Sequence, residues 1–195
     1  MPTEYDFDME NTDRGLKERV SQRARESKIK LTNDLLLVSI ARQKLWHWVG
    51  DTLRTTYPVS TSLRPPSCRE GSFGTPTGFF QISDKIGAEA SAGMVFKGRV
   101  PQGYHWAEAS PAEQAEALIT SRILWLDGLE PGHNRHGSVD TRQRYIYIHG
   151  TNRPERIGTP QSAGCVLLRD EEMIHLFQQV KTGTVVWIGE AETAD

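Results

Sequence analysis

A histidine and a cysteine stand at the two ends of one connection in residues 145–168, which read YIYIHGTNRPERIGTPQSAGCVLL. An alternating apolar segment ends at His149, and a second apolar run begins directly after Cys165. A free thiol has a pKa of about 8.5 and only the thiolate attacks, so a cysteine nucleophile needs a nearby base at neutral pH. An imidazole can accept that proton. The pair therefore predicts a cysteine acyl-transfer site.

The same two residues also allow a purely structural interpretation. A cysteine before an apolar run is often a small buried side chain, and a histidine at a strand end is often only a hydrogen-bond partner. The neighbours of Cys165 favour chemistry, because Gly164 leaves room for a substrate. The backbone N–H groups around Gly164 and Cys165 are also suited to face a developing oxyanion.

The order of motifs in the chain resembles the L,D-transpeptidase (YkuD-like) family. In that family HG is followed by a segment of the form (S/T)HGC(I/V)R, and here HGT is followed by SAGCVLL. The resemblance extends to YPVST at 57–61, GTPTGFFQI at 74–82 and EEMIHLFQQVKTGTVVWI at 171–188, in the same order. It covers the chain from about residue 30 to residue 188.

Two positions depart from the family motif. Ala163 stands where the family usually has histidine, and Leu167 stands where it usually has arginine. Arg169 would share a strand face with Leu167 and is a candidate substitute. The family's catalytic base corresponds to His149, which is present. We expect the departures to affect rate and substrate choice more than reaction type.

The resemblance implies a reaction on peptidoglycan stem peptides. Cys165 would attack the carbonyl between the L-centre of a diamino acid and the terminal D-amino acid, and His149 would be general base and then acid. The carbonyl of Gly150 would orient the imidazole, and Ser162 and Gly164 would line the oxyanion site. An amine from a neighbouring stem would resolve the thioester into a crosslink, whereas water would make the protein an L,D-carboxypeptidase. The residues expected to line the substrate groove are Thr151, Ala163, Arg169, Tyr104 and Trp106.

Two other classes of function stay open. A non-catalytic peptidoglycan-binding relative would keep the groove and lose the chemistry, as Ala163 and Leu167 would permit. A zinc-dependent peptidase would use His133, His136 and His149, but the H-x-x-H spacing alone is a weak signal because zinc takes three or four protein ligands. We therefore expect neither a metal nor another cofactor.

Composition limits the remaining possibilities. The 195 residues suit one domain with an extra segment, and 37% hydrophobic residues with a mean hydropathy of −0.52 suit one apolar core. A formal net charge of −2 gives no electrostatic case for a nucleic-acid partner. No apolar run approaches the roughly 20 residues of a transmembrane helix. The two cysteines predict no disulfide framework, so Cys68 is either a bystander or a redox partner of Cys165.

The first 15 residues, MPTEYDFDMENTDRG, are acidic and do not have the pattern of a secretory signal. The resemblance implies a periplasmic or cell-wall location. The alternatives of a trimmed start, another export route and action inside the cell stay open. The oligomeric state is equally open.

The elements that must position the site are mostly strands. We expect a mainly β fold, an L,D-transpeptidase-like mixed β-sandwich with one helix after the cysteine and an extra N-terminal helix. Residues 1–29 would form an N-terminal extension and 30–190 the catalytic domain. The expected strands lie at 31–41, 44–49, 52–60, 78–82, 94–100, 121–129, 142–148, 166–168 and 184–188.

Three helices are expected. One spans 11–28, capped by Asn11 or Thr12, with an apolar stripe that packs on the domain or a partner or is solvated. A short one follows Ser110, with Glu113 completing a capping box. The third begins near Asp170. His47 and His175 are expected on the surface.

Overall fold

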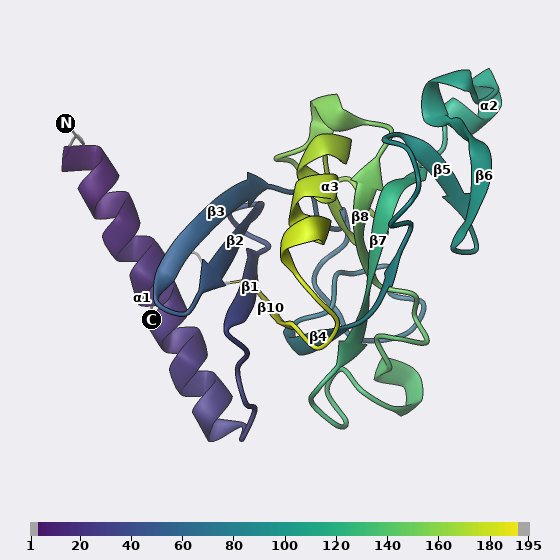
Figure 1. Ribbon diagram of the computed structural model, residues 1–195. Coiled ribbons are helices and arrows are strands. Elements are labelled where there is room, and N and C mark those ends of the chain that lie inside the picture. Colours follow the sequence, from purple (N-terminus) through teal and green to yellow (C-terminus); the bar gives the residue numbers. More distant parts are fainter. Residues whose placement is uncertain (1–3, 191–195) are drawn as a thin grey trace.

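Ten strands form one curled sheet in the computed structural model, which describes the backbone of residues 4–190 and the side chains of residues 13–190 (Figure 1). The strand order is β3-β2-β1-β10-β4-β7-β5-β6, and β8 joins β7 to β9. The β1–β10 and β8–β9 pairs are parallel and the others antiparallel. The expectation of a mainly β, mixed-sheet fold is confirmed.

The strands are β1 Asp34–Ser39, β2 Lys44–Val49, β3 Thr52–Pro58, β4 Gly78–Ile86, β5 Met94–Lys97, β6 Val100–His105, β7 Ile119–Gly128, β8 Tyr147–Thr151, β9 Val166–Leu168 and β10 Val185–Gly189. The α-helices are α1 Glu4–Glu26, α2 Pro111–Gln114 and α3 Asp170–Gln179. Short 3-10 turns lie at η1 Trp106–Glu108, η2 Gly137–Val139 and η3 Pro154–Arg156.

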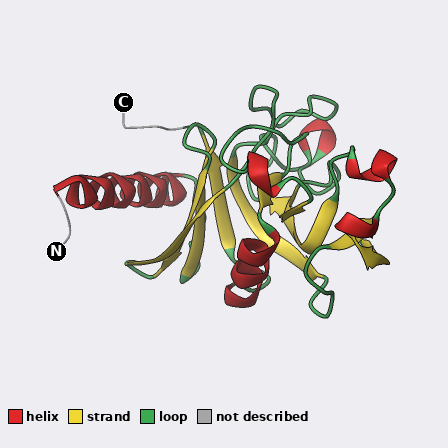
Figure 2. Cartoon of the chain, turned by 90° about the horizontal axis from the view of Figure 1, so that it is seen from above, coloured by secondary structure: helices red, strands yellow, loops and turns green. Residues whose placement is uncertain are grey.

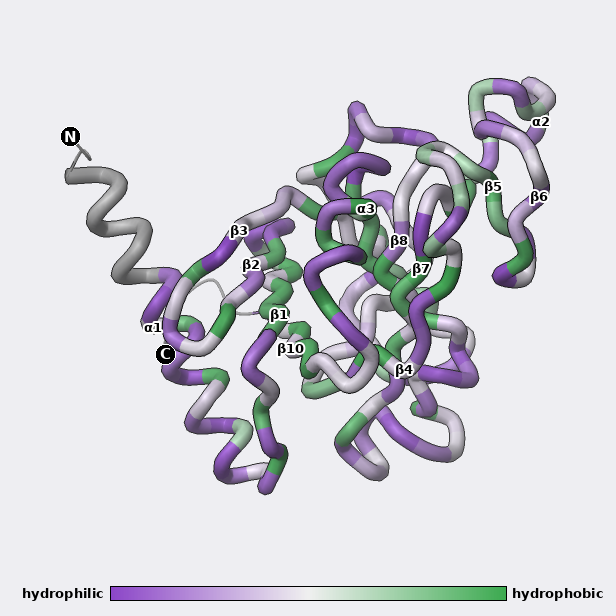
Figure 3. Tube along the Cα trace, in the orientation of Figure 1, coloured by the Kyte–Doolittle hydropathy of each residue, from purple (hydrophilic) through white to green (hydrophobic). Residues whose placement is uncertain are grey.

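The main core lies between α3 and one face of the sheet. Alternate residues of the central strands point into it, and the strands of this region are strongly hydrophobic (Figure 3). From α3, Met173, Leu176 and Phe177 complete this core at helical spacing. This helix therefore packs against β7 and β8, the second of which carries His149.

The opposite face of β1, β2 and β10 is covered by α1 (Figure 2). Leu16, Val20 and Ala24 are buried there against a layer that includes Trp46 and Trp187. The apolar stripe of this helix was expected to pack on the domain, to pack on a partner or to be solvated, and it packs on the domain. The expected start was wrong, because the helix begins at Glu4 and runs through both proposed capping residues.

His47 was expected on the surface, but its side chain is buried and its Nε2 lies 3.0 Å from Asp34 Oδ1. Strand β2 is covered on both faces, since Trp46 and Trp48 pack under α1 while Leu45 belongs to the main core. Alternation along a strand identifies an exposed face only when one face is bare. His175 is exposed as expected, and its Nδ1 lies 2.8 Å from the Tyr57 hydroxyl.

The region expected to be one strand at 94–100 is a hairpin of β5 and β6. Lys97 pairs with Val100, so Gly98 and Arg99 form a two-residue turn, and both have positive φ, 52° and 68°. After β6, the expected short helix is present as α2, with the Ser110–Glu113 capping box in place. The hairpin and α2 stand at the end of the molecule away from α1 (Figure 1).

None of the helices formed by residues 4–190 is both long and apolar enough to cross a bilayer.

Candidate active site

Strand β8 presents Tyr147 and His149 on one face and Ile148 on the other, because successive side chains alternate. Ile148 lies in the main core. Tyr147 instead packs in a separate apolar cluster with Ile123 of β7, and Cys165 packs against that cluster. The predicted nucleophile and base therefore lie on the face of β8 and β9 that α3 does not cover.

The parallel pairing of β8 with β9 sets the spacing of the two groups. His149 is opposite Leu167, so Cys165, just before β9, is level with Tyr147. The offset of two residues is roughly 7 Å along a strand. No hydrogen bond joins Cys165 Sγ to the imidazole within residues 13–190. Catalytic hydrogen bonds are often long without substrate and shorten when it binds.

The turn before Cys165 is fixed by its own residues. The Ser162 hydroxyl donates to the carbonyl of Cys165 (2.6 Å) and accepts from the N–H of Gly164 (3.2 Å). Gly164 has φ +126°, which disfavours other residues, and a Cβ there would lie 3.3 Å from the carbonyl oxygen of Gly74. Ser162 thus shapes the turn, and the Gly164 N–H is already hydrogen-bonded.

The thiol of Cys165 is half-buried. Its Sγ accepts a hydrogen bond from the backbone N–H of Tyr147 (3.4 Å) and lies 3.6 Å from the carbonyl oxygen of Tyr145. Burial raises the pKa of Cys165 to about 11, although the Tyr147 N–H and the charge of Arg144 act in the opposite direction. The group is therefore a neutral thiol at neutral pH.

His149 is buried, with its ring held by one hydrogen bond. Nδ1 lies 2.7 Å from the carbonyl oxygen of Gly150, and a carbonyl only accepts, so Nδ1 carries the proton and Nε2 keeps its lone pair. Burial lowers the pKa of His149 to about 4, and the Gly150 hydrogen bond offsets part of this. At rest the site therefore holds a neutral thiol and a neutral imidazole.

These pKa values predict the pH dependence of two reactions of Cys165, measured in a Cys68→Ser variant with a single thiol. Alkylation by iodoacetamide needs the free thiolate, so its rate should rise about tenfold per pH unit from pH 7 to 10 and level off only near the pKa of about 11. Acylation assisted by neutral His149 should be flat from pH 5 to 9 and fall as His149 is protonated at its pKa of about 4. An alkylation rate that levels off near pH 8.5 would contradict the burial argument.

Gly150 packs closely against the first residue of α3. The Asp170 carboxylate accepts hydrogen bonds from Thr120 Oγ1 (2.5 Å), Ser121 Oγ (2.6 Å) and Trp106 Nε1 (3.2 Å). A Cβ on Gly150 would lie 2.3 Å from Asp170 Oδ1. Trp106, predicted to line the groove, is thereby linked through Asp170 to the strand that carries His149.

Gly150→Ala should lower the free energy of unfolding by about 1–3 kcal/mol, because the added methyl forces Asp170 or the backbone of Thr120 to move. Denaturant titration measures this change. Gly15→Ala on α1 is the matched control, since its methyl would meet only the end of the Arg19 side chain, at 3.4 Å, and alanine favours helices. Equal midpoints for Gly150→Ala and the unchanged protein would show that the packing is looser than described.

The other residues predicted to line the groove lie in different surroundings. Ala163 is exposed and Thr151 is buried, with its hydroxyl accepting from the Arg153 N–H (3.2 Å). The Tyr104 hydroxyl donates to Glu113 (3.0 Å), on the outlying hairpin. Arg169 pairs with Glu172 at the start of α3 (3.4 Å), so its guanidinium is engaged there.

The cation whose charge acts on Cys165 is Arg144, which was not predicted from the sequence. Its half-buried guanidinium donates to the carbonyl oxygens of Ser67 (2.9 Å) and Gly74 (2.8 Å). It thus ties the loop before β4 to the segment before β8, and Gly74 of that loop lies against Gly164. The only signal in the sequence was its position close to the histidine, and spacing alone does not show that an arginine turns back onto a distant loop.

Cys68 and the histidines at 133 and 136 lie on neighbouring loops. Cys68 is a free thiol whose Sγ lies 3.8 Å from His133 Nε2, and the same nitrogen lies 3.0 Å from the carbonyl oxygen of Thr77. The backbone N–H of His136 donates to Asp140 (2.8 Å). No group of three or more His, Cys, Asp or Glu side chains within residues 13–190 is arranged to hold a metal ion.

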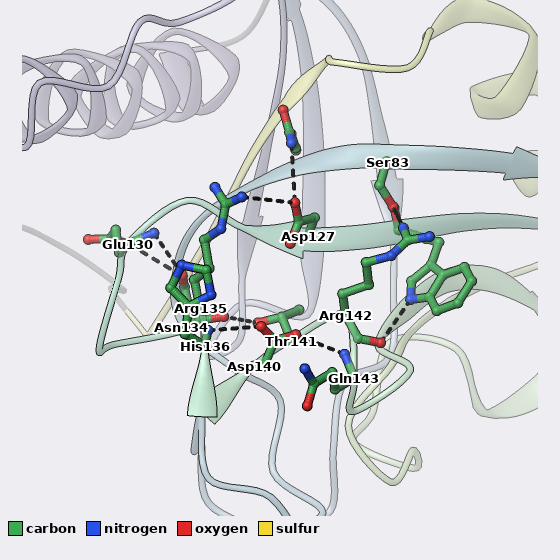
Figure 4. A network of polar contacts seen from close by, with 12 residues as sticks. Ser83, Asp127, Glu130, Asn134, Arg135, His136, Asp140, Thr141, Arg142 and Gln143 are labelled. Carbon is green, nitrogen blue, oxygen red and sulfur yellow. Dashed lines mark hydrogen bonds and ion pairs between the residues drawn. The ribbon is translucent and has the colours of Figure 1, made fainter. Parts of the chain in front are cut away.

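A polar network holds the loop between β7 and β8 in place (Figure 4). The buried Asn134 side chain donates to the carbonyl oxygen of Phe79 (3.0 Å). Arg142 forms an ion pair with Asp84 (2.5 Å), and its carbonyl accepts from Trp125 Nε1 (3.2 Å). Trp125 on β7 is opposite Tyr147, so this network supports an aromatic wall beside Cys165.

A model of the YkuD family, the L,D-transpeptidase catalytic domain, matches residues 33–188. With this fold and this match, the chain belongs to the L,D-transpeptidase catalytic-domain family. A protein of Bacillus subtilis (strain 168) named "Putative L,D-transpeptidase YqjB" is 46% identical over 48 residues, which are 25% of this chain and 27% of that protein.

Two solved structures have a similar fold. The Ldtfm-avibactam carbamoyl enzyme has a TM-score of 0.52 and 16% identity, covering 83% of this chain and 51% of its own. A cysteine-to-serine mutant of an L,D-transpeptidase from Enterococcus faecium has a TM-score of 0.50 and 16% identity, covering 82% of this chain and 50% of its own. This chain therefore spans about half the length of these structures and 27% of the curated relative.

Proposed function

We propose that this protein is a cysteine-dependent L,D-transpeptidase that acts on peptidoglycan stem peptides through a thioester. The observation that carries the proposal is the hydrogen bond from His149 Nδ1 to the Gly150 carbonyl. It leaves the lone pair of Nε2 free to accept a proton. His149 lies on β8, and Cys165 directly precedes the neighbouring strand, β9. The family membership supplies the reaction class.

In this mechanism the thiol loses its proton as it attacks. Sγ bonds to the carbonyl carbon that follows the L-centre of the diamino acid, and the proton passes to His149 Nε2. Because both groups are neutral at rest, proton transfer accompanies attack. His149 then returns the proton to the leaving amine, the C–N bond breaks, and the terminal D-amino acid departs from the thioester.

The oxyanion needs donors that are not already engaged. Ser162 accepts from the Gly164 N–H, so we assign Ser162 and Gly164 to shaping the turn and the Cys165 N–H to the oxyanion. One such donor contributes on the order of 10²–10³ in rate in other acyl-transfer enzymes. Arg144 adds a positive charge on the same side.

An amine from a second stem would resolve the thioester and form a crosslink, and the site of action would be the cell wall or periplasm. Water as the acceptor would give an L,D-carboxypeptidase from the same intermediate. A binding protein without chemistry would form no intermediate at all. These three outcomes differ in product, so one experiment separates them.

The test is incubation of the protein with purified muropeptides bearing tetrapeptide stems, followed by mass spectrometry. Crosslinked dimers with loss of the terminal residue are the expected product, and tripeptide monomers alone would indicate hydrolysis. Exposure to a carbapenem should also add its mass to the peptide that contains Cys165. Neither product nor adduct, with a folded protein, would overturn the proposal in favour of a binding role.

A further inference from the structure

We propose that Arg99 binds the carboxylate of the terminal residue of the donor stem, the residue that leaves when the thioester forms. This inference rests on the proposed function and adds a specificity determinant to it.

Arg99 lies in the two-residue turn of the β5–β6 hairpin, with φ +68°. Positive φ at such a turn favours Gly or Asn, and an arginine there is uncommon. Its side chain does not extend into solvent. It is half-buried and folds back onto β7 and β8, where its guanidinium lies 4.6 Å from the Trp125 ring centroid and 5.1 Å from that of Tyr145.

The charge of Arg99 has only neutral partners. Nη1 donates to the hydroxyl of Tyr147 (3.1 Å), and no aspartate or glutamate within residues 13–190 forms an ion pair with it. Arg142 also lies against Trp125, at 4.1 Å from its centroid, but Asp84 neutralises it (2.5 Å). Of these two arginines, Arg99 is therefore the one whose charge is available to a ligand.

Tyr147 connects this cation to the nucleophile. Its phenol holds the guanidinium, and its backbone N–H donates to Cys165 Sγ. Arg99 thus stands about one tyrosine side chain from the sulfur, on the same face of β8.

A carboxylate is the ligand that this arrangement fits. A guanidinium presents planar paired donors that match a carboxylate, and the aromatic rings fix its plane. In the donor stem, the carboxylate of the leaving residue is three bonds from the carbonyl that Sγ attacks. Leu167, in place of the arginine of the family motif, leaves the strand after the cysteine without a cation of its own.

The experiment compares two donor tetrapeptides that differ only at the C-terminus, one a free acid and one an amide. The unchanged protein should prefer the acid by roughly 10- to 100-fold in kcat/KM, as expected for a hydrogen-bonded charged pair. Arg99→Met roughly keeps the length of the side chain. It should remove the preference by lowering kcat/KM for the free-acid donor, while kcat/KM for the amide stays the same. Arg99→Lys should retain part of it and guards against a folding defect. Lys97→Met, on the same hairpin, is the matched control and should keep the full preference.

Binding of both peptides to a Cys165→Ala variant, measured by calorimetry with and without Arg99→Met, makes the inference independent of turnover. A preference for the acid that Arg99→Met abolishes supports the inference even if no crosslinking occurs, in which case only the proposed reaction fails. Equal handling of acid and amide by the unchanged protein would overturn it while leaving the reaction intact. A preference that survives Arg99→Met would overturn it as well.

Discussion

Cys165→Ala is expected to fold normally and to lose both thioester formation and crosslinking, with a fall in rate on the order of 10⁴-fold or more. The physical reason is that Cys68, the other thiol of the chain, lies on a different loop, near His133. Removing one half-buried sulfur should cost only about 1 kcal/mol of unfolding free energy. Intact-mass measurement with a tetrapeptide donor, together with thermal unfolding, checks both parts.

Cys68→Ser is the matched control for this variant, because it removes the only other thiol. It should keep the full rate. If Cys165→Ala retained turnover close to that of the unchanged protein, the sulfur could not be the nucleophile. Loss of activity in Cys68→Ser with retention in Cys165→Ala would move the assignment to the other cysteine.

His149→Asn should slow acylation by about 10²–10⁴-fold while preserving the local structure. The asparagine amide can still donate to the Gly150 carbonyl in place of Nδ1, but it has no basic nitrogen to accept the thiol proton. The variant must then rely on the small thiolate population. Its rate should therefore climb about tenfold per pH unit toward the pKa of Cys165, about 11, whereas the unchanged protein shows a plateau.

His175→Asn is the control for this prediction, because His175 is exposed on α3 and bonded to Tyr57. Its rate and pH profile should match those of the unchanged protein. A His149→Asn variant with a flat pH profile and near-normal rate would remove His149 from the reaction.

The features that were predictable from sequence depend on local rules. The helical spacing of Met173, Leu176 and Phe177 predicted α3, and the Ser110–Glu113 spacing predicted the cap of α2. Both follow from backbone geometry over a few residues.

The features that were missed depend on packing between elements that are distant in the sequence. His47 was misplaced because both faces of β2 are covered, the Trp46 and Trp48 face by α1 and the face that His47 shares with Leu45 by the main core. Strand β8 was expected from residue 142, but Tyr145 has φ +56° and the strand begins at Tyr147. The roles proposed for Arg99 and Arg144 come from long side chains that fold back across the chain, which no spacing reveals.

The two positions that depart from the family motif, Ala163 and Leu167, have different surroundings. Ala163 is exposed on the turn before the cysteine, so a histidine at this position would also be exposed there. Leu167 is buried opposite His149, where it adds to the desolvation that lowers the pKa of the imidazole to about 4. We expect both positions to tune the reaction without replacing its two central groups.

The most direct test of the account is the mass of the protein after brief exposure to a tetrapeptide donor without an acceptor, quenched in acid. We expect an added mass equal to the donor minus its free terminal amino acid, located by digestion on the peptide that contains Cys165 and absent from Cys165→Ala. A folded protein that binds the donor but never gains this mass, or gains it on another residue, would contradict the account.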